Sequence, residues 1–99
     1  MVHKTVTVLA LVKAKQGMEE IVGQELFSLV KPTRSEPGCI SYNLHQAIDD
    51  KSLFMFYENW KSQEDLDKHR EMPHLKAFRE KADNLLAKPI EVTLFEMIS

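Results

Sequence analysis

The middle of the chain, residues 39–60, restricts the fold more than any other part of the sequence. Apolar and polar residues alternate through 39–48 and again through 53–60, which is the period-two pattern of half-buried β-strands. The sequence Asp-Asp-Lys at 49–51 separates the two segments and favours a turn. Two strands joined by so short a connection form an antiparallel hairpin, around which the other elements must be arranged.

The register of this hairpin decides which of its side chains meet. A loop of two or four residues at the turn places Ile48 opposite Leu53. The same register pairs polar residues of the first strand with aromatic or acidic residues of the second: Ser41 with Trp60, Asn43 with Glu58, and His45 with Phe56. The polar side chains of the hairpin then share one face with its aromatic rings. A shift by one residue would separate the two sets.

Hydrophobic periodicity predicts the elements on either side of the hairpin. They are a strand at 5–13, a helix at 18–30, a turn at 36–38, helical segments at 63–71 and 74–86 on either side of Pro73, and a strand at 90–98. The order strand-helix-strand-strand-helix-strand is that of the ferredoxin-like α+β fold, an antiparallel four-stranded sheet with helices on one face. With 99 residues, we expect residues 1–99 to form a single domain.

The first strand, 5–13, carries apolar side chains on both of its faces. Helices of this fold cover one face of the sheet, so the other face keeps an apolar surface too large to leave in water. The sequence therefore predicts a homodimer in which the open faces of two sheets pack together.

Composition excludes several classes of protein. Lys and Arg number 13 against 15 Asp and Glu, and no basic run is present, so we expect no nucleic-acid partner. No apolar run approaches the length of a membrane span, and the N-terminal segment lacks the form of a signal peptide. The single cysteine, Cys39, rules out an internal disulfide and fits a reducing compartment. We therefore expect a cytoplasmic protein without a membrane partner.

The hairpin and the helix after it resemble the antibiotic biosynthesis monooxygenase family of dimeric α+β barrels. The resemblance rests on Glu36-Pro37-Gly38 before Tyr42, on Glu58-Asn59-Trp60, on His69, on Pro73-His74 and Phe78, and on the tail PIEVTLFEMI. It implies a monooxygenase that oxidises a quinol or polycyclic phenol with O₂ and needs no flavin, haem or metal. Related proteins include haem-degrading oxygenases, but the strand 5–13 lacks the Asn that this branch carries.

Three residues are candidates for a catalytic role. His69 titrates near neutrality and can accept or return a proton, although it can equally make a structural hydrogen bond. Glu58 lies between aromatic residues of a strand, where a carboxylate must be paired or have a shifted pKa. Its structural alternative is a salt bridge, or a bond that closes the helix onto the sheet. Asn43, opposite Glu58 in the predicted register, could orient a substrate oxygen or simply face solvent.

Four further residues are candidates for substrate binding. Phe56 and Trp60 could form aromatic walls, or Trp60 could pack in the core. His45 could orient a substrate oxygen. His74 could also bind substrate, but its place at a helix start favours a cap or a surface residue. Because His69 and His74 are five residues apart across a proline, we expect no metal site.

The reaction itself stays open at this point. A monooxygenase would bind a small aromatic or quinone-like substrate and O₂. An isomerase or epimerase of a small, possibly phosphorylated, carbonyl compound would use His69 and Glu58 as an acid-base pair. A third possibility is a dimeric stress-response module that binds an apolar metabolite without turning it over, because a fold alone does not define a reaction.

Overall fold

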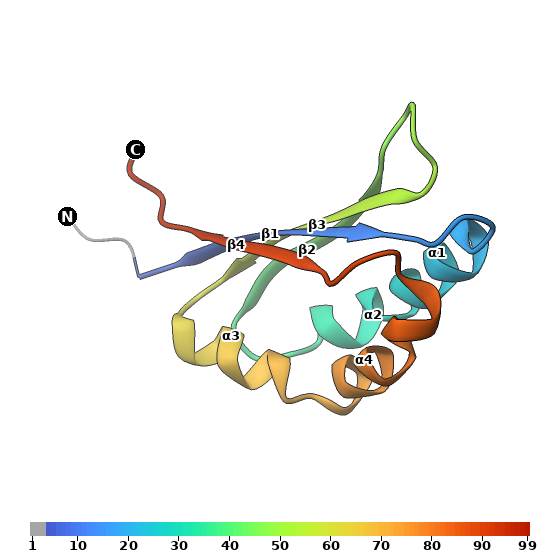
Figure 1. The fold of residues 1–99 in the computed structure, drawn as a ribbon. Coiled ribbons are helices and arrows are strands. Elements are labelled where there is room, and N and C mark those ends of the chain that lie inside the picture. Colours follow the sequence, from blue (N-terminus) through green and yellow to red (C-terminus); the bar gives the residue numbers. More distant parts are fainter. Residues whose placement is uncertain (1–3) are drawn as a thin grey trace.

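In a computed structural model that describes residues 4–99, four antiparallel strands form one sheet in the order β2-β3-β1-β4 (Figure 1). The strands are β1 (Val6–Lys13), β2 (Cys39–Gln46), β3 (Leu53–Trp60) and β4 (Glu91–Phe95). The helices are α1 (Glu19–Ser28), α2 (Val30–Arg34), α3 (Gln63–Arg70) and α4 (Pro73–Leu85). All four lie on the same side of the sheet. The predicted ferredoxin-like α+β fold is confirmed.

The hairpin register differs from the predicted one by one residue. Tyr42 pairs with Glu58, and Leu44 pairs with Phe56, whereas Asn43 lies opposite Tyr57. The backbone N–H of Ala47 donates to the Leu53 carbonyl at 2.9 Å, so the loop between them holds an odd number of residues instead of two or four. Since side chains alternate along a strand, this shift places Tyr42 and Leu44, rather than Asn43 and His45, on the same face of the sheet as Phe56 and Glu58.

The predicted element boundaries are close to those observed, with two differences. The helix predicted at 18–30 is two helices, because α2 follows α1 directly and extends to Arg34. Pro32 is tolerated there because it lies in the first turn, where a backbone N–H has no partner within the helix. The last strand ends at Phe95 rather than at Ile98. Pro73 is the first residue of α4, a position that suits its fixed φ.

The core lies between the sheet and the helices. Side chains that point toward the helices form the helix-covered face, on which Val8, Val12, Phe56 and Trp60 are each at most 4% exposed. The other side is the open face, where no helix packs against the described residues. The strands there present Thr7, Leu9 and Leu11 of β1, Met55, Tyr57 and Asn59 of β3, Asn43 and His45 of β2, and Thr93 and Phe95 of β4.

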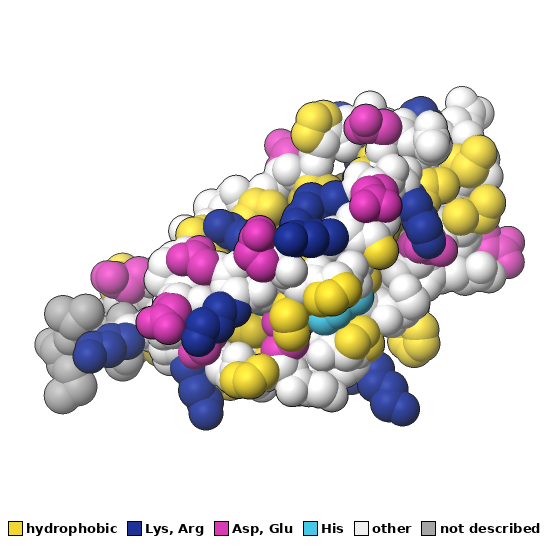
Figure 2. Space-filling view, turned by 90° about the horizontal axis from the view of Figure 1, so that it is seen from below, with side chains coloured by type: hydrophobic (Ala, Val, Ile, Leu, Met, Phe, Trp, Pro, Cys, Tyr) yellow, Lys and Arg dark blue, Asp and Glu magenta, His cyan; other side chains and the backbone are white. Residues whose placement is uncertain are grey.

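The helix layer, seen from outside in Figure 2, carries basic and acidic side chains interspersed rather than gathered by sign. Among the described residues, every helix is too short or too polar to cross a lipid bilayer.

Candidate functional site

An apolar cavity of about 230 Å³ lies between the helix-covered face and the helices. Aliphatic and aromatic side chains of the sheet and of the helices form most of its wall, including Val8, Val12, Leu26, Leu29, Tyr42, Phe56, Leu66 and Phe78. Its polar lining residues are few, namely Glu58, His69, Arg70 and Arg79. A mostly apolar pocket with a few convergent polar groups is the usual form of a small-molecule site.

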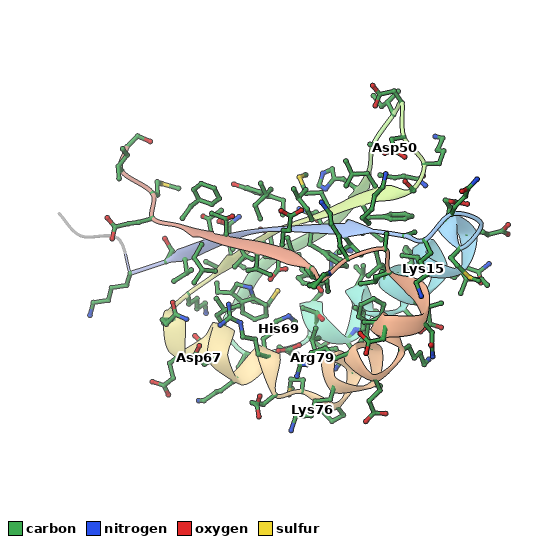
Figure 3. The ribbon with its side chains drawn as sticks, viewed as in Figure 1. Lys15, Asp50, Asp67, His69, Lys76 and Arg79 are labelled. Atoms are coloured by element: carbon green, nitrogen blue, oxygen red, sulfur yellow. The ribbon has the colours of Figure 1, made fainter. Side chains whose placement is uncertain are left out.

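His69 reaches this cavity from α3 (Figure 3). The helix begins at a cap in which Ser62 Oγ accepts from the Asp65 backbone N–H at 3.1 Å. Leu66 and His69, three residues apart, then share its buried face at 2% and 4% exposure. The imidazole packs on Trp60, with the ring centroids 4.5 Å apart. Burial is the main cause that lowers the pKa of His69, so the ring is neutral near pH 7.

Glu36 holds His69 in place from the turn before β2. Its carboxylate lies 2.9 Å from His69 Nδ1 and 2.8 Å from His74 Nε2. Thr33 Oγ1 lies 3.1 Å from the same nitrogen of His74. Glu36 is 7% exposed and Thr33 is fully buried, so these bonds are shielded from water. The carboxylate accepts from both rings, which places the His69 proton on Nδ1 and leaves the Nε2 lone pair free.

Glu58 is a second buried carboxylate, on the opposite wall of the cavity in β3. It is 5% exposed, and its Oε1 accepts from Trp60 Nε1–H at 2.9 Å. Burial raises the pKa of Glu58 to about 7, more than the Trp60 bond and the charge of Arg70 lower it. A group with this pKa can give or take a proton at neutral pH.

Tyr42 is a cavity residue that the sequence interpretation did not assign to the site. Its ring stacks on Phe56 with a centroid separation of 4.5 Å and meets His69 edge-on at 5.5 Å. Burial, followed by the nearby Glu58 charge, raises the pKa of Tyr42, so its hydroxyl stays protonated. The apolar alternation of β2 marked Tyr42 as a half-buried residue. The predicted register, however, placed its side chain on the face of the sheet opposite to Phe56 and Glu58.

The structure brings some predicted site residues together and separates others. Four of them gather on the helix-covered side: Phe56, Glu58 and His69 line the cavity, and His74 joins the network through Glu36. Trp60 is fully buried beneath His69 and bonds Glu58 rather than facing the cavity.

Asn43 and His45 lie on the open face, away from the other candidates. They pair with Tyr57 and Met55, and both are exposed. Asn43 Oδ1 accepts a hydrogen bond from Arg34 Nη2 at 3.0 Å. The predicted pairings of Asn43 with Glu58 and His45 with Phe56 are therefore wrong, because the odd loop length reverses the face that β2 turns inward.

Glu36, His69 and His74 also carry the ligand atoms that could hold a metal ion, since these atoms lie within 4.8 Å of one another. The five-residue spacing across Pro73 does not keep the two imidazoles apart, contrary to the geometric expectation from the sequence. Two histidines and one carboxylate match the donor set of several transition-metal sites. The same three side chains are satisfied by the carboxylate-imidazole hydrogen bonds.

Comparison with known proteins adds the relatives of this chain. The family described as "Antibiotic biosynthesis monooxygenase" matches residues 5–81. The "Uncharacterized protein sll1783" of Synechocystis is 39% identical over 70 residues, which are 71% of this chain and 48% of that protein. The "Putative monooxygenase Rv0793" of Mycobacterium tuberculosis is 39% identical over 69 residues, 70% of this chain and 67% of that protein. The match thus spans about half the length of the Synechocystis relative.

Solved structures extend the similarity to almost every residue. The structure of Rv0793 superposes with a TM-score of 0.90 at 29% identity and covers 96% of both chains. The crystal structure of PA3566 from Pseudomonas aeruginosa superposes with a TM-score of 0.93 at 29% identity, covering 100% of this chain and 99% of that one.

Proposed function

Because this chain belongs to the antibiotic biosynthesis monooxygenase family, we propose that it is a monooxygenase that oxidises a quinol with O₂ in the cavity on the helix-covered face. The observation that carries this proposal is the buried His69, which lines an apolar cavity and whose Nδ1 is held by Glu36. The cavity of about 230 Å³ is smaller than the sites of drug-sized ligands, which favours a one-ring quinol over a polycyclic phenol.

The proposed chemistry needs a proton acceptor and an enclosed apolar space. His69 Nε2 takes the proton of a substrate hydroxyl, and Glu36 stabilises the imidazolium that forms at the other side of the ring. The substrate anion then supplies the electrons that reduce O₂. One oxygen atom is inserted at a ring carbon and the other leaves as water. Glu58, with a pKa of about 7, can return a proton to the departing oxygen.

Oxygen uptake with a panel of substituted hydroquinones tests this function. We expect the parent protein to consume O₂ above the blank, and His69→Ala to lose at least about 100-fold in rate, which is typical of removing a general base. His45→Gln is the matched control, because this histidine lies on the open face and is exposed. Absence of uptake by the parent, or full uptake by His69→Ala, would exclude the proposal.

A second reaction is favoured by the presence of two proton-handling groups on one cavity. Glu58 and His69 both line it, and near pH 7 the carboxyl is partly protonated while the imidazole is neutral. Such a pair can move a proton next to a carbonyl, as an isomerase or epimerase requires. Exchange of deuterium from solvent into a carbonyl substrate without O₂ consumption would identify this reaction. Ligand binding with neither result would indicate a binding module.

We further propose a homodimer formed through the open face. Tyr57 and Phe95 are 42% and 48% exposed there, next to the aliphatic residues Leu9 and Leu11. Members of this family are typically dimeric. Packing two such faces would remove an apolar surface from water.

A further inference from the structure

We propose that Arg70 and Arg79 form an anion-binding rim on the cavity and select aromatic substrates that carry an acidic substituent beside the oxidisable ring. Both residues line the cavity that contains His69 and Glu58. The orientation of the reacting ring rests on the proposed function, whereas the binding of the anion does not.

The junction between α3 and α4 places the two guanidinium groups. Arg70 is the last residue of α3, and Arg79 lies on α4, the helix that follows it (Figure 3). Arg79 Nη2 donates to the backbone carbonyl of Arg70 at 2.5 Å, which ties the Arg79 side chain to the end of α3. A guanidinium has five N–H donors, so most of those on Arg79 are left for a ligand.

Among residues 4–99, neither arginine makes a short ion pair that is shielded from water. The Arg70 contact with Asp67 is 3.9 Å long and joins side chains that are 44% and 60% exposed, so it is a weak and water-screened pair. For Arg79, the polar contact within the described chain is the Arg70 carbonyl. By contrast, Arg34 bonds both the Tyr42 carbonyl and Asn43. Glu58, whose pKa the Arg70 charge lowers, lies on the same cavity but is partly protonated near pH 7. The two guanidinium groups therefore keep positive charge beside an apolar cavity, which favours an anionic ligand.

The positions of the lining residues define how such a ligand would lie. Arg79 and Val92 are exposed members of the cavity wall, so the cavity opens between α4 and β4. Phe56 and Tyr42, stacked at 4.5 Å, form the deep aromatic wall near His69. A carboxylate held at the rim would direct the ring inward, with its hydroxyl toward His69. The substrate class is therefore a hydroxylated aromatic acid.

Binding of a matched pair of probes without O₂ tests this site. The probes are 2,5-dihydroxybenzoate and its methyl ester, which share the quinol ring and differ in the charge. Titration calorimetry under anaerobic conditions should give at least about tenfold tighter binding of the acid, because charge-assisted hydrogen bonds are lost in the ester. The preference should fall as the salt concentration rises, since charge screening weakens the contact.

Arginine variants locate the effect. Arg79→Gln and Arg70→Gln should each reduce the preference for the acid, and the double variant should abolish it while the ester binds as before. Lys76→Gln is the matched control, because Lys76 is an exposed cation of α4 that contacts Glu71 outside the cavity. Circular dichroism melting confirms that each variant is folded. Should a variant not fold, Arg→Lys at the same position keeps the charge and tests the bidentate geometry instead.

The outcomes separate this proposal from the proposed reaction. Equal affinity for the two probes, a preference that survives in the double variant, or failure of both probes to bind at millimolar concentration overturns the anion rim. A clear preference for the acid without O₂ uptake by any quinol supports the rim and excludes the monooxygenase. Uptake with neutral quinols and no preference for the acid supports the monooxygenase and excludes the rim.

Discussion

The two faces of the sheet are built from the same strands but have different surroundings. On the helix-covered face, Phe56 and Glu58 are 4% and 5% exposed and line a cavity. On the open face, Tyr57, which lies between them in the sequence, is 42% exposed. One step along β3 therefore moves a side chain from a buried site of altered acid-base chemistry to the exposed face that we propose as the dimer interface. Substitutions that act on one face alone can test this division.

The largest expected effect is the pH dependence that Glu58 imposes on the helix-covered face. Burial raises its pKa from 4.5 to about 7, so the folded protein binds a proton more tightly than the unfolded chain does. The free energy of unfolding therefore decreases as the pH rises from about 4.5 to 7. Glu58→Gln keeps an oxygen that can accept the hydrogen bond from Trp60, but it has no proton to lose, so its stability does not decrease over this pH range. We expect it to be more stable than the parent by up to about 3 kcal/mol above pH 7.

Urea unfolding of both proteins between pH 4 and pH 8 measures this difference. It should be near zero below pH 4.5 and greatest above pH 7. His69 acts in the opposite sense, because its lowered pKa costs stability as the pH falls below 6.5. That contribution is present in both proteins and cancels in the difference. A stability difference that does not change with pH would show that Glu58 is not buried as a proton-binding group.

The fold and the site differ in how far the sequence could predict them. The alternation in 53–60 correctly placed Phe56 and Glu58 on one face of β3, because the period of one strand distinguishes its own two faces. It did not indicate which of the two faces the helices cover. The pairing of β2 with β3 depended on the loop, where Asp50 Oδ1 accepts from both the backbone N–H and the hydroxyl of Ser52. No strand pattern contains that loop geometry.

Glu36 shows a second limit of predicting the site from the sequence. It belongs to a Glu-Pro-Gly turn, and its partners His69 and His74 are 33 and 38 residues away in the sequence. Only the packing of α3 and α4 against that turn brings the three together. Arg79 was missed for a similar reason, because it lies beside the apolar stripe of α4 and its position relative to Arg70 depends on the angle between two helices.

The next prediction concerns the open face. Tyr57→Asp places a carboxylate among apolar residues that we propose to be buried between two copies of the chain. By symmetry the dimer would contain this charge twice, without a partner. We expect the dissociation constant to rise at least about 100-fold, equivalent to about 2.7 kcal/mol. Light scattering after size exclusion should then give the monomer mass at micromolar concentration.

Tyr57→Phe is the control, because it keeps the ring and removes only the hydroxyl. This variant should remain dimeric. A parent protein that is already monomeric at the same concentration would contradict assembly through the open face, and a Tyr57→Asp protein that remains dimeric would place the interface elsewhere.

The smallest expected effect is the difference in stability between alanine substitutions at two glycines, Gly38, which lies against another side chain, and Gly17, which does not. Gly17 and Gly38 have nearly the same positive φ, 88° and 84°, so an alanine at either position is strained to the same degree. At Gly38 an added Cβ would also collide with the Asp65 side chain at the start of α3, whereas nothing lies within 4 Å at Gly17. Gly17→Ala should cost about 1 kcal/mol of unfolding free energy, and Gly38→Ala about 1 kcal/mol more.

Urea denaturation of the two variants measures the difference, which reports how tightly the turn carrying Glu36 is packed against the helix carrying His69. Equal losses would mean that α3 yields to the extra methyl group, and the position of His69 would then be less rigid than its contact with Glu36 indicates.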